Sequence, residues 1–569
     1  MSSLLSQETI NISRVTVSAG RVPSLPDSIP ISLRQIWIDI SSPSRLSRRR
    51  SEQDYRLSAA QLWRKHTCFQ EARAEAMADA GEATATARSS SPLHVVVFPW
   101  LAFGHIIPYM ELSEQLARRG HAVTFVSAPR NLARLRPVPD DLRARIRLLP
   151  LPMPTVAGLP DGAESTADVP PEKGDLLKAA FDGFAAPFAG FLAGACAGDC
   201  GDGEGTTGFG KKPDWIFVDF AHHWLPPIAE QHKVPCALFS IFPAVFIAFA
   251  GTKAANEARP RVTAEDLAAQ PPWIPFPTPI AHRLYEAEQM VYVFRPNASG
   301  VCDAFRFWET ERQCPLFILR SCREVDGALC PLIADLYGKP LALSGLLAPY
   351  DAARAAQEAG GEDHDEDEET ASLMRWLDEQ PARSVLYVAF GSEAPLTPDN
   401  VRELAAGLEL SGARFLWALR EASAPLLPGD GFQERVGGRG VVRAGWVPQV
   451  RVLAHSAVGA FLTHAGWSSL MESFLFGHPL VMLPLFADQG LTARVMAARG
   501  VGLEVPRDER DGSFGRADLA STVRRVMARE DEEGKALARN AREFQEMLCD
   551  RAKQEEYVDE LVEHLRRLP

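Results

Sequence analysis

The chain has 569 residues, a formal net charge of −13, and ordinary proportions of hydrophobic (46%) and charged (23%) residues. This composition excludes a largely disordered chain and a polytopic membrane protein, because it can form large buried cores in water. The acidic balance argues against a main role in binding nucleic acid or an anionic membrane, since both require a strongly cationic surface.

Residues 1–91 are predicted to be a poorly ordered N-terminal extension. The first 76 of them are rich in Ser and Arg, include Arg48-Arg49-Arg50, and contain no apolar signal-peptide core. Two interpretations stay open: a plastid transit segment, or an extension from an upstream start, since Met77 begins an ordinary leader. The nine scattered cysteines include no CxxC pair, which favours reduced thiols and a cytoplasmic location.

A first α/β series begins near residue 93. Apolar runs predict strands at 94–100, 122–127, 215–220 and 236–242, and helical spacing predicts a helix at 109–119 that ends before Gly120. A strand–helix–strand opening implies a parallel sheet, and we assign this domain to residues 92–345.

A second α/β series begins near residue 384. It contains predicted strands at 385–390, 415–419, 459–463 and 480–485 and predicted helices at 401–410 and 468–476. The second domain is assigned to residues 373–545, and a C-terminal helix within 546–569 is expected to pack back on the first domain. The fold class is therefore α/β, with two doubly wound Rossmann-like domains facing a cleft, where ligands bind at the carboxyl ends of the strands.

An acidic run at 362–369 separates the two series and is interpreted as part of a flexible linker over 346–372, because like charges repel one another and stay solvated. Its DxD-like triplets are therefore not assigned to a metal site. A GxGxxG match at 203–208 lacks the strand before it and the helix after it that a phosphate loop requires, so a surface loop is expected. His222 and His223 are expected to pack or to line a pocket.

The stretch 234–251 is long and apolar enough to raise the question of a membrane span. Pro243 divides it, which favours a buried strand followed by an apolar helix. No stable membrane span is expected.

The strongest functional signal lies in the 44 residues from Trp446 to Gln489. The indole of Trp446 suits stacking on a base. A strand, Gly466 and a helix follow one another, which places backbone N–H groups and a positive dipole end where a pyrophosphate can bind. His464 is placed to donate to a phosphate oxygen, and Glu472 to accept ribose hydroxyls.

This segment resembles the plant secondary-product glycosyltransferase box of the UDP-dependent family 1 glycosyltransferases, whose architecture is called GT-B. In that family's pattern, Asp488 and Gln489 would read the sugar, and Gln449 would lie beside the uridine. The resemblance implies the following donor-binding residues: Ser392, Trp446, Val447, Gln449, His464, Gly466, Trp467, Ser468, Ser469, Glu472, Asp488 and Gln489. Ser468 departs from the family's usual asparagine and loses an amide donor, at a cost of about 1 kcal/mol if one hydrogen bond is lost.

The first domain carries a second resemblance. Residues 99–108 are similar to the family's opening strand and loop, which implies that His105 is the catalytic base, and 218–220 is similar to the segment with its partner, Asp219. Histidine has a suitable pKa for taking a proton from an acceptor hydroxyl, and a carboxylate can fix its tautomer. The motifs at 127–131 and 159–162 look closest to the branch that acts on terpenoid and flavonoid glycosides.

The expected function is inverting, metal-independent transfer of a sugar from a UDP-sugar to a small lipophilic acceptor or its glycoside. Gln489 favours glucose, with rhamnose and xylose left open. The UDP-sugar is the donor substrate, no cofactor is expected, and the protein is expected to be a monomer that does not bind nucleic acid. Two alternatives are a UDP-sugar-binding protein with weak or no transfer, motivated by Ser468, and a nucleotide-sugar epimerase, which the box argues against.

Overall fold

The computed structural model describes residues 91–197, 209–351, 353, 368–391, 393–394, 396–429 and 431–568. The predicted N-terminal extension, the glycine-rich motif at 203–208 and most of the acidic run lie outside the described residues. The part from residue 90 onward is a single compact unit.

The first sheet is seven-stranded and parallel, in the order β3-β2-β1-β4-β5-β6-β7. Most of these strands are buried along their whole length, as expected where helices cover both faces of a parallel sheet. Its strands are β1 (His94–Phe98), β2 (Ala122–Ser127), β3 (Ile146–Pro150), β4 (Trp215–Val218), β5 (Cys236–Ser240), β6 (Leu316–Leu319) and β7 (Leu341–Leu343).

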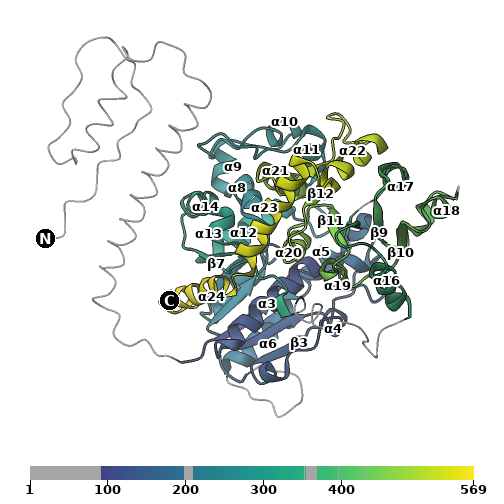
Figure 1. The fold of residues 1–569 in the computed structure, drawn as a ribbon. Coiled ribbons are helices and arrows are strands. Elements are labelled where there is room, and N and C mark those ends of the chain that lie inside the picture. The colour runs from purple at the N-terminus through teal and green to yellow at the C-terminus, as the bar shows by residue number, and fades with distance from the viewer. Residues whose placement is uncertain are drawn as a thin grey trace, which may run out of the picture. The chain divides into compact units, whose positions relative to one another are not determined.

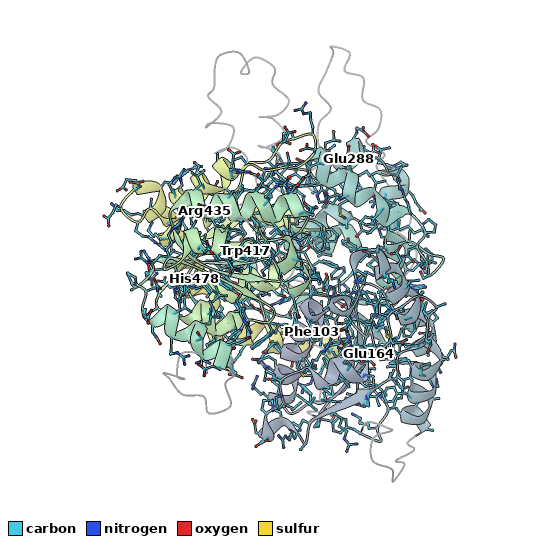
Figure 2. All side chains as sticks on the ribbon, turned by 90° about the vertical axis from the view of Figure 1, so that its right-hand side faces the viewer. Phe103, Glu164, Glu288, Trp417, Arg435 and His478 are labelled. Carbon is cyan, nitrogen blue, oxygen red and sulfur yellow. The ribbon has the colours of Figure 1, made fainter. Side chains whose placement is uncertain are left out.

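The second sheet is six-stranded and parallel, in the order β10-β9-β8-β11-β12-β13. Its strands are β8 (Val385–Ala389), β9 (Arg414–Leu419), β10 (Gly440–Ala444), β11 (Val458–Thr463), β12 (Leu480–Met482) and β13 (Gly502–Glu504). The elements of the first-sheet region lie beside those of the second-sheet region, which holds Trp417 and His478 (Figure 2).

Helices connect the strands (Figure 1). The first-sheet region contains α3 (Phe103–Arg118), α4 (Pro129–Ala133), α5 (Gly174–Asp182), α6 (Ala185–Ala197), α7 (Leu225–Gln231), α8 (Ala244–Ala250), α9 (Lys253–Ala258), α10 (Ala264–Leu267), α11 (Leu284–Met290), α12 (Asp303–Gln313), α13 (Arg323–Asp326) and α14 (Leu329–Tyr337). The later helices are α16 (Glu368–Asp378), α17 (Pro398–Ser411), α18 (Phe432–Val436), α19 (Gln449–Ala454), α20 (Trp467–Phe474), α21 (Gln489–Ala498), α22 (Arg516–Met527), α23 (Glu532–Cys549) and α24 (Arg551–Arg567).

Local sequence accounts for the limits of helix α17. Thr397 is its N-cap and accepts from the backbone N–H of Asn400, whose side chain accepts from the Thr397 N–H in return. Pro398 occupies the first helical position, where its missing N–H costs nothing. Gly412 ends the helix with φ +72°, a conformation that glycine adopts without strain.

The predicted fold class is confirmed: two parallel α/β sheets of Rossmann-like type. Helix α3 begins at Phe103, six residues before the predicted start, and contains Pro108. His105 therefore lies in the first turn of a helix. The sequence had instead indicated a loop at this position.

The described residues at the two ends of the segment 346–372, which the sequence assigns to a linker, belong to the folded structure. Leu346, Leu347 and Ala348 are buried. Glu368 and Glu369, the last residues of the acidic run, form the first turn of α16, where negative charge favours the helix.

Helix α24 crosses back to the first sheet. It contacts β7 and α3, beside which it lies in Figure 1. Its Val558, Leu561 and Leu565 belong to the same buried cluster as Val95 of β1. The backbone carbonyl of Leu565 accepts a 2.9 Å hydrogen bond from the indole N–H of Trp215.

The apolar stretch 234–251 forms strand β5, a short loop at Pro243 and helix α8. Within the described residues, one helical stretch, 174–197, is long and apolar enough to span a membrane by length and composition alone. It consists of α5 and α6, and its Phe181, Phe188 and Leu192 are fully buried in the protein core.

Candidate active site

Each sheet has a point where the strand order reverses direction, and such a point forms a crevice at the carboxyl ends of the strands. In the first sheet it lies between β1 and β4, which lead to His105 and Asp219. In the second sheet it lies between β8 and β11, which lead to Gly391 and His464. Both crevices therefore hold residues that the sequence assigns to the site. Ser392 lies outside the described residues.

His105 and Asp219 form the most direct contact in the first crevice. Nδ1 of His105 is 2.7 Å from Oδ2 of Asp219, and the two side chains are 12% and 1% exposed. The same Asp219 oxygen accepts from the backbone N–H of Trp100 at 3.0 Å, and Oδ1 accepts from that of Phe220 at 2.7 Å. Hydrogen bonds to both of its oxygens hold the carboxylate in place, and the carboxylate in turn orients the imidazole of His105. The contact uses Nδ1 of His105 and does not involve Nε2.

Charge in the crevice favours a protonated histidine. Burial lowers the pKa of His105, but the charge and hydrogen bond of Asp219 outweigh it, with smaller contributions from Glu393 and Asp488, so the pKa is raised above its ordinary value. Burial would raise the pKa of Asp219, yet His105 and the two backbone N–H groups hold it below its usual range. Asp488, from the second-sheet region, is therefore close enough to His105 to affect its charge.

An apolar cavity of about 230 Å³ opens beside His105. The rings of Phe220 and Phe242 line it and also contact the His105 ring, with centroids 5.8 and 5.5 Å away. Ala487, next to Asp488, lines the same cavity. A small apolar molecule in this cavity would therefore lie against the two rings that contact His105 and against Ala487 of the second-sheet region.

On the second-sheet side, Trp446 is 73% exposed, although it is one of the largest apolar side chains. Val447, beside it, is buried. Gln449 donates from Nε2 to Oε2 of Glu472 at 2.6 Å and accepts from the Tyr387 hydroxyl at 3.3 Å. The structure thus brings Gln449 and Glu472 together and leaves a face of Trp446 open to solvent.

His464 is enclosed by glycines. A Cβ at Gly391 would meet the imidazole at 3.0 Å, and one at Gly466 would overlap Nε2. Glycine is therefore the residue that fits at both positions. Gly391 also has φ +71°, a conformation that glycine adopts without strain. Burial lowers the pKa of His464 to about 4, so this imidazole is neutral at pH 7 and offers an N–H without a positive charge.

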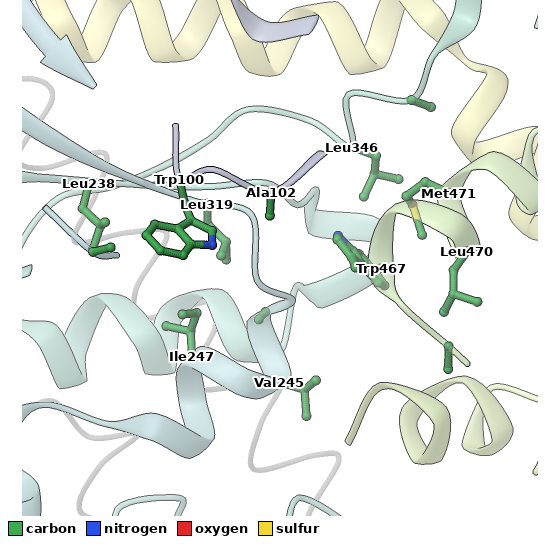
Figure 3. Packing of buried hydrophobic residues seen from close by; sticks show 14 of the residues in the cluster. Trp100, Ala102, Leu238, Val245, Ile247, Leu319, Leu346, Trp467, Leu470 and Met471 are labelled. Atoms are coloured by element: carbon green, nitrogen blue, oxygen red, sulfur yellow. The ribbon is translucent and has the colours of Figure 1, made fainter. Parts of the chain in front are cut away.

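The N-terminus of α20 contacts the first-sheet region. The Trp467 indole N–H donates to the carbonyl of Arg320 at 3.4 Å, and Figure 3 shows this indole close to Ala102 and Leu346. The Ser468 hydroxyl accepts from Nη1 of Arg320 at 2.8 Å and donates to the carbonyl of Gly104 at 3.4 Å.

Pro108 explains why the Gly104 carbonyl is available. A helix normally pairs this carbonyl with the N–H four residues later, and Pro108 has none. The hydroxyl of Ser468 supplies a donor from the other sheet region. This hydrogen bond links the helical turn that contains His105 to the N-terminus of α20, which is part of the predicted donor site.

The remaining predicted residues lie at the same edge. Ser469 Oγ is 3.5 Å from Nε2 of Gln449. Gln489 is buried, and its Oε1 accepts from the backbone N–H groups of Leu485 and Phe486 at 2.9 and 3.1 Å, which leaves its amide N–H₂ for a ligand. Burial raises the pKa of Asp488 to about 6. The oxygen of Gln489 is thus used within the protein.

Arg320 is a site residue that sequence reasoning missed. It follows β6, a four-residue strand that was not predicted, and no motif surrounds it.

His222 packs among aromatic rings, and its Nδ1 accepts from the Asp219 N–H at 3.1 Å. Within the described ranges, no three His, Cys, Asp or Glu side chains gather closely enough to hold a metal ion.

Comparison with known proteins identifies the family of this chain. The family model described as UDP-glucoronosyl and UDP-glucosyl transferase matches residues 349–538. UDP-glycosyltransferase 91C1 of Arabidopsis thaliana is 39% identical over 475 residues, covering 83% of this chain and 96% of that protein. Soyasaponin III rhamnosyltransferase of Glycine max is 36% identical over 480 residues, covering 84% and 96%.

Solved structures show the same fold. A UDP-glucosyltransferase from Polygonum tinctorium, described as capable of glucosylating indoxyl, has a TM-score of 0.64 at 25% identity and covers 84% of this chain and 100% of its own. A protein of Arabidopsis thaliana complexed with UDP-L-rhamnose has a TM-score of 0.60 at 24% identity, with the same coverage. From the length and identity of these matches, the chain belongs to the UDP-dependent glycosyltransferases of family 1 and is a glycosyltransferase enzyme with the GT-B fold.

Proposed function

We propose that this enzyme transfers glucose from UDP-glucose, with inversion, to a hydroxyl of a small lipophilic acceptor or its glycoside. The observation that carries the proposal is the His105–Asp219 pair, which lies beside an aromatic cavity and close to Asp488 of the second-sheet region. A base, an acceptor space and a donor site then meet at one place.

The chemistry requires one proton transfer and one displacement. Nε2 of His105 takes the proton of the acceptor hydroxyl while that oxygen attacks the anomeric carbon of the sugar. The bond between this carbon and the diphosphate oxygen breaks, and UDP leaves with the electron pair. Asp219 stabilises the imidazolium that forms and keeps Nδ1 as the donor. Attack opposite the leaving group converts an α-linked donor into a β-glycoside.

We propose the following roles for the donor residues. Trp446 stacks on uracil, Gln449 and Val447 lie beside the uridine, and Glu472 accepts from the ribose hydroxyls. The diphosphate lies at the N-terminus of α20, where the first helical N–H groups lack partners inside the helix. Ser392, His464, Gly466, Trp467, Ser468 and Ser469 surround it, and these donors stabilise the leaving group without a metal ion.

The sugar would lie between Asp488, Gln489 and His105. The free amide N–H₂ of Gln489 and the carboxylate of Asp488 offer a donor and an acceptor for neighbouring hydroxyls. Glucose carries hydroxyls along the whole edge of its ring and can use both groups. A 6-deoxy sugar such as rhamnose would use fewer of them, although two relatives are rhamnosyltransferases by name.

The acceptor class follows from the cavity wall, which is mainly aromatic and aliphatic, with Phe242, Phe246, Phe307 and Trp308 among its residues. Flat or fused-ring apolar skeletons fit such a wall. The relatives named for soyasaponin III and for anthocyanidin 3-O-glucoside favour terpenoid or flavonoid glycosides as acceptors. We include steviol glycosides among the proposed terpenoid acceptors. We further propose that the protein acts as a cytoplasmic monomer.

The proposal is tested by a screen of UDP-glucose, UDP-rhamnose and UDP-xylose against terpenoid and flavonoid glycosides, with product masses and the anomeric configuration by NMR. We expect β-glucosides, with UDP-glucose as the preferred donor. An α-glucoside formed from UDP-glucose would refute inversion, and faster transfer from UDP-rhamnose would refute the choice of glucose. Tight UDP binding with no transfer to any acceptor would favour a UDP-sugar-binding protein instead.

A further inference from the structure

A buried arginine lies against the proposed diphosphate site. Arg320 is 2% exposed. Its Nε donates to the carbonyl of Leu346 at 2.8 Å, Nη2 donates to that of Leu347 at 3.2 Å, and Nη1 donates to the hydroxyl of Ser468 at 2.8 Å. The guanidinium is thus held rigidly by the first-sheet region and directed at the N-terminus of α20.

No carboxylate among the described residues lies within ion-pair distance of Arg320, although buried arginines are commonly paired. Burial lowers its pKa to about 10, so the side chain keeps its charge at pH 7. An unpaired buried charge is costly, and an anion bound nearby would offset that cost. Arg306, equally buried, shows the contrast, since Asp182 binds it through both oxygens at 2.6 Å.

The proposed donor site otherwise lacks positive charge. None of its twelve residues is Lys or Arg, and His464 is neutral at pH 7 because burial lowers its pKa to about 4. UDP carries negative charge when bound and gains more as the bond to the sugar breaks. Helix N–H groups supply only partial charges to balance it.

Ser468 connects this arginine to the reacting groups. Its hydroxyl accepts from Arg320 and donates to the carbonyl of Gly104, next to His105. The backbone N–H of Ser468 belongs to the first turn of α20, which has no helical partner for it. A diphosphate at this helix end would lie near the Ser468 hydroxyl and the guanidinium behind it.

We propose that Arg320 is a positioning residue for the donor diphosphate: it holds the Ser468 hydroxyl at the N-terminus of α20 and supplies the positive charge that the donor site lacks. The proposal rests on the function proposed above, because it requires a UDP-sugar at this site. It predicts that Arg320 affects ligands with a diphosphate and leaves uridine recognition unchanged.

The test is calorimetric titration of the full-length protein with UDP and with uridine, which differ only in the diphosphate. In Arg320→Met, which keeps the length of the side chain but removes its charge, we expect UDP affinity to fall about 10- to 100-fold and uridine affinity to change less than about 3-fold. Arg320→Lys restores the charge and is expected to recover part of the loss. Equal losses for UDP and uridine would show that the arginine only supports packing between the sheet regions, and would overturn the proposal.

Ser468→Ala provides a second route that does not disturb the buried guanidinium. We expect it to weaken UDP binding selectively, and the double variant to bind UDP no more weakly than Arg320→Met, because both changes break one link. Additive losses of UDP affinity in the double variant would refute the proposed connection between Arg320 and the diphosphate through Ser468. Unchanged UDP affinity in Ser468→Ala would also refute it, and this result can be obtained even if Arg320→Met fails to fold. A wild-type protein that does not bind UDP would refute the proposed function itself, whereas normal UDP binding and transfer with an unchanged UDP-to-uridine ratio would refute only the role of Arg320.

Discussion

The imidazole of His105 and the carboxylate of Asp219 lie 114 positions apart in the chain and 2.7 Å apart in space. They meet because β1 and β4, which precede them, are neighbours in the first sheet. Two backbone N–H groups hold the carboxylate in place before any substrate arrives. This arrangement preorganises the pair for the role of base proposed above.

His105→Ala removes the group that we propose as the base for the acceptor hydroxyl. We expect the turnover rate to fall by about 10²- to 10⁴-fold, the usual contribution of a general base. UDP affinity should stay within a few-fold of wild type, because the histidine belongs to the acceptor side. The measurement is the initial rate with UDP-glucose at saturating acceptor, together with calorimetric UDP binding. Full turnover in this variant would remove His105 as the base.

Asp219→Asn is expected to move the pH dependence of the reaction. His105 acts as a base only when neutral, so kcat/KM should fall as the pH drops through its pKa, which Asp219 holds above the ordinary value. Replacing the carboxylate leaves burial, which lowers the pKa of His105, and the charges of Glu393 and Asp488, which raise it by less. The acidic limb of kcat/KM should therefore shift to lower pH, while the plateau rate falls by about tenfold or more.

Asp488 needs a control in that experiment, since its own pKa of about 6 places a second ionisation in the same range. In Asp488→Asn this ionisation disappears, and the limb that belongs to His105 should remain. An acidic limb that stays at the same pH in Asp219→Asn would contradict the electrostatic coupling of the pair.

Trp446→Ala tests base stacking without a cost in stability. The side chain is 73% exposed, so its removal leaves no cavity, and the melting temperature should change little. Stacking on a base contributes about 1–3 kcal/mol, so UDP and uridine affinity should both fall by about 5- to 150-fold. Trp446→Phe keeps an aromatic face and should recover much of the loss. Unchanged affinity for both ligands would place the base elsewhere.

Phe246→Trp narrows the aromatic cavity beside His105. We expect the KM for a bulky glycoside acceptor to rise by about tenfold, as a badly fitting group in a hydrophobic pocket costs about 1–3 kcal/mol. Donor binding should not change. Phe246→Leu, which enlarges the same space, is the matched control and should favour larger acceptors. A change in UDP affinity without a change in acceptor KM would show that this cavity is not the acceptor site.

Gly490→Ala tests the polar contact between α11 and α21. Glu286 of α11 binds Arg494 of α21 at 2.8 Å, and Gly490 lies so close to Glu286 that an added methyl group would overlap its carboxylate. Displacing this half-buried pair should lower the free energy of unfolding by about 1–3 kcal/mol, measured by chemical denaturation. Glu286→Gln removes the charge without the overlap and should cost less. Equal stability of Gly490→Ala and wild type would show that the contact is dispensable.

The sequence predicted the central strands better than the peripheral ones. The β1 run His94-Val95-Val96-Val97 is apolar throughout because both of its faces are buried, and such a run is visible without a structure. Strands β7 and β13 have three residues each, too short for a periodic signal, and were missed. The sequence indicated a strand and loop over 99–108 and a helix from 109, whereas helix α3 begins at Phe103 and accommodates Pro108 because another region of the protein satisfies the carbonyl that Pro108 leaves unpaired.

The site shows the same division. Residues inside one contiguous motif, such as His464 and Glu472, could be assigned because their spacing along a strand and helix places them at one edge. Arg320 could not, since its importance depends on a contact with Ser468, 148 positions away, and on the absence of a carboxylate partner among the described residues. The use of the Gln489 oxygen by a neighbouring loop is likewise a property of the folded backbone.

Helix α24 has a consequence for how the enzyme is made. It is the last helix of the chain, yet it covers part of the first sheet and accepts the indole N–H of Trp215 through the Leu565 carbonyl. During synthesis, the first sheet emerges from the ribosome long before this helix exists. The nascent chain must therefore keep an apolar surface near Trp215 uncovered until residues 551–567 have been synthesised, and a message truncated before residue 551 would produce a protein that exposes this surface permanently.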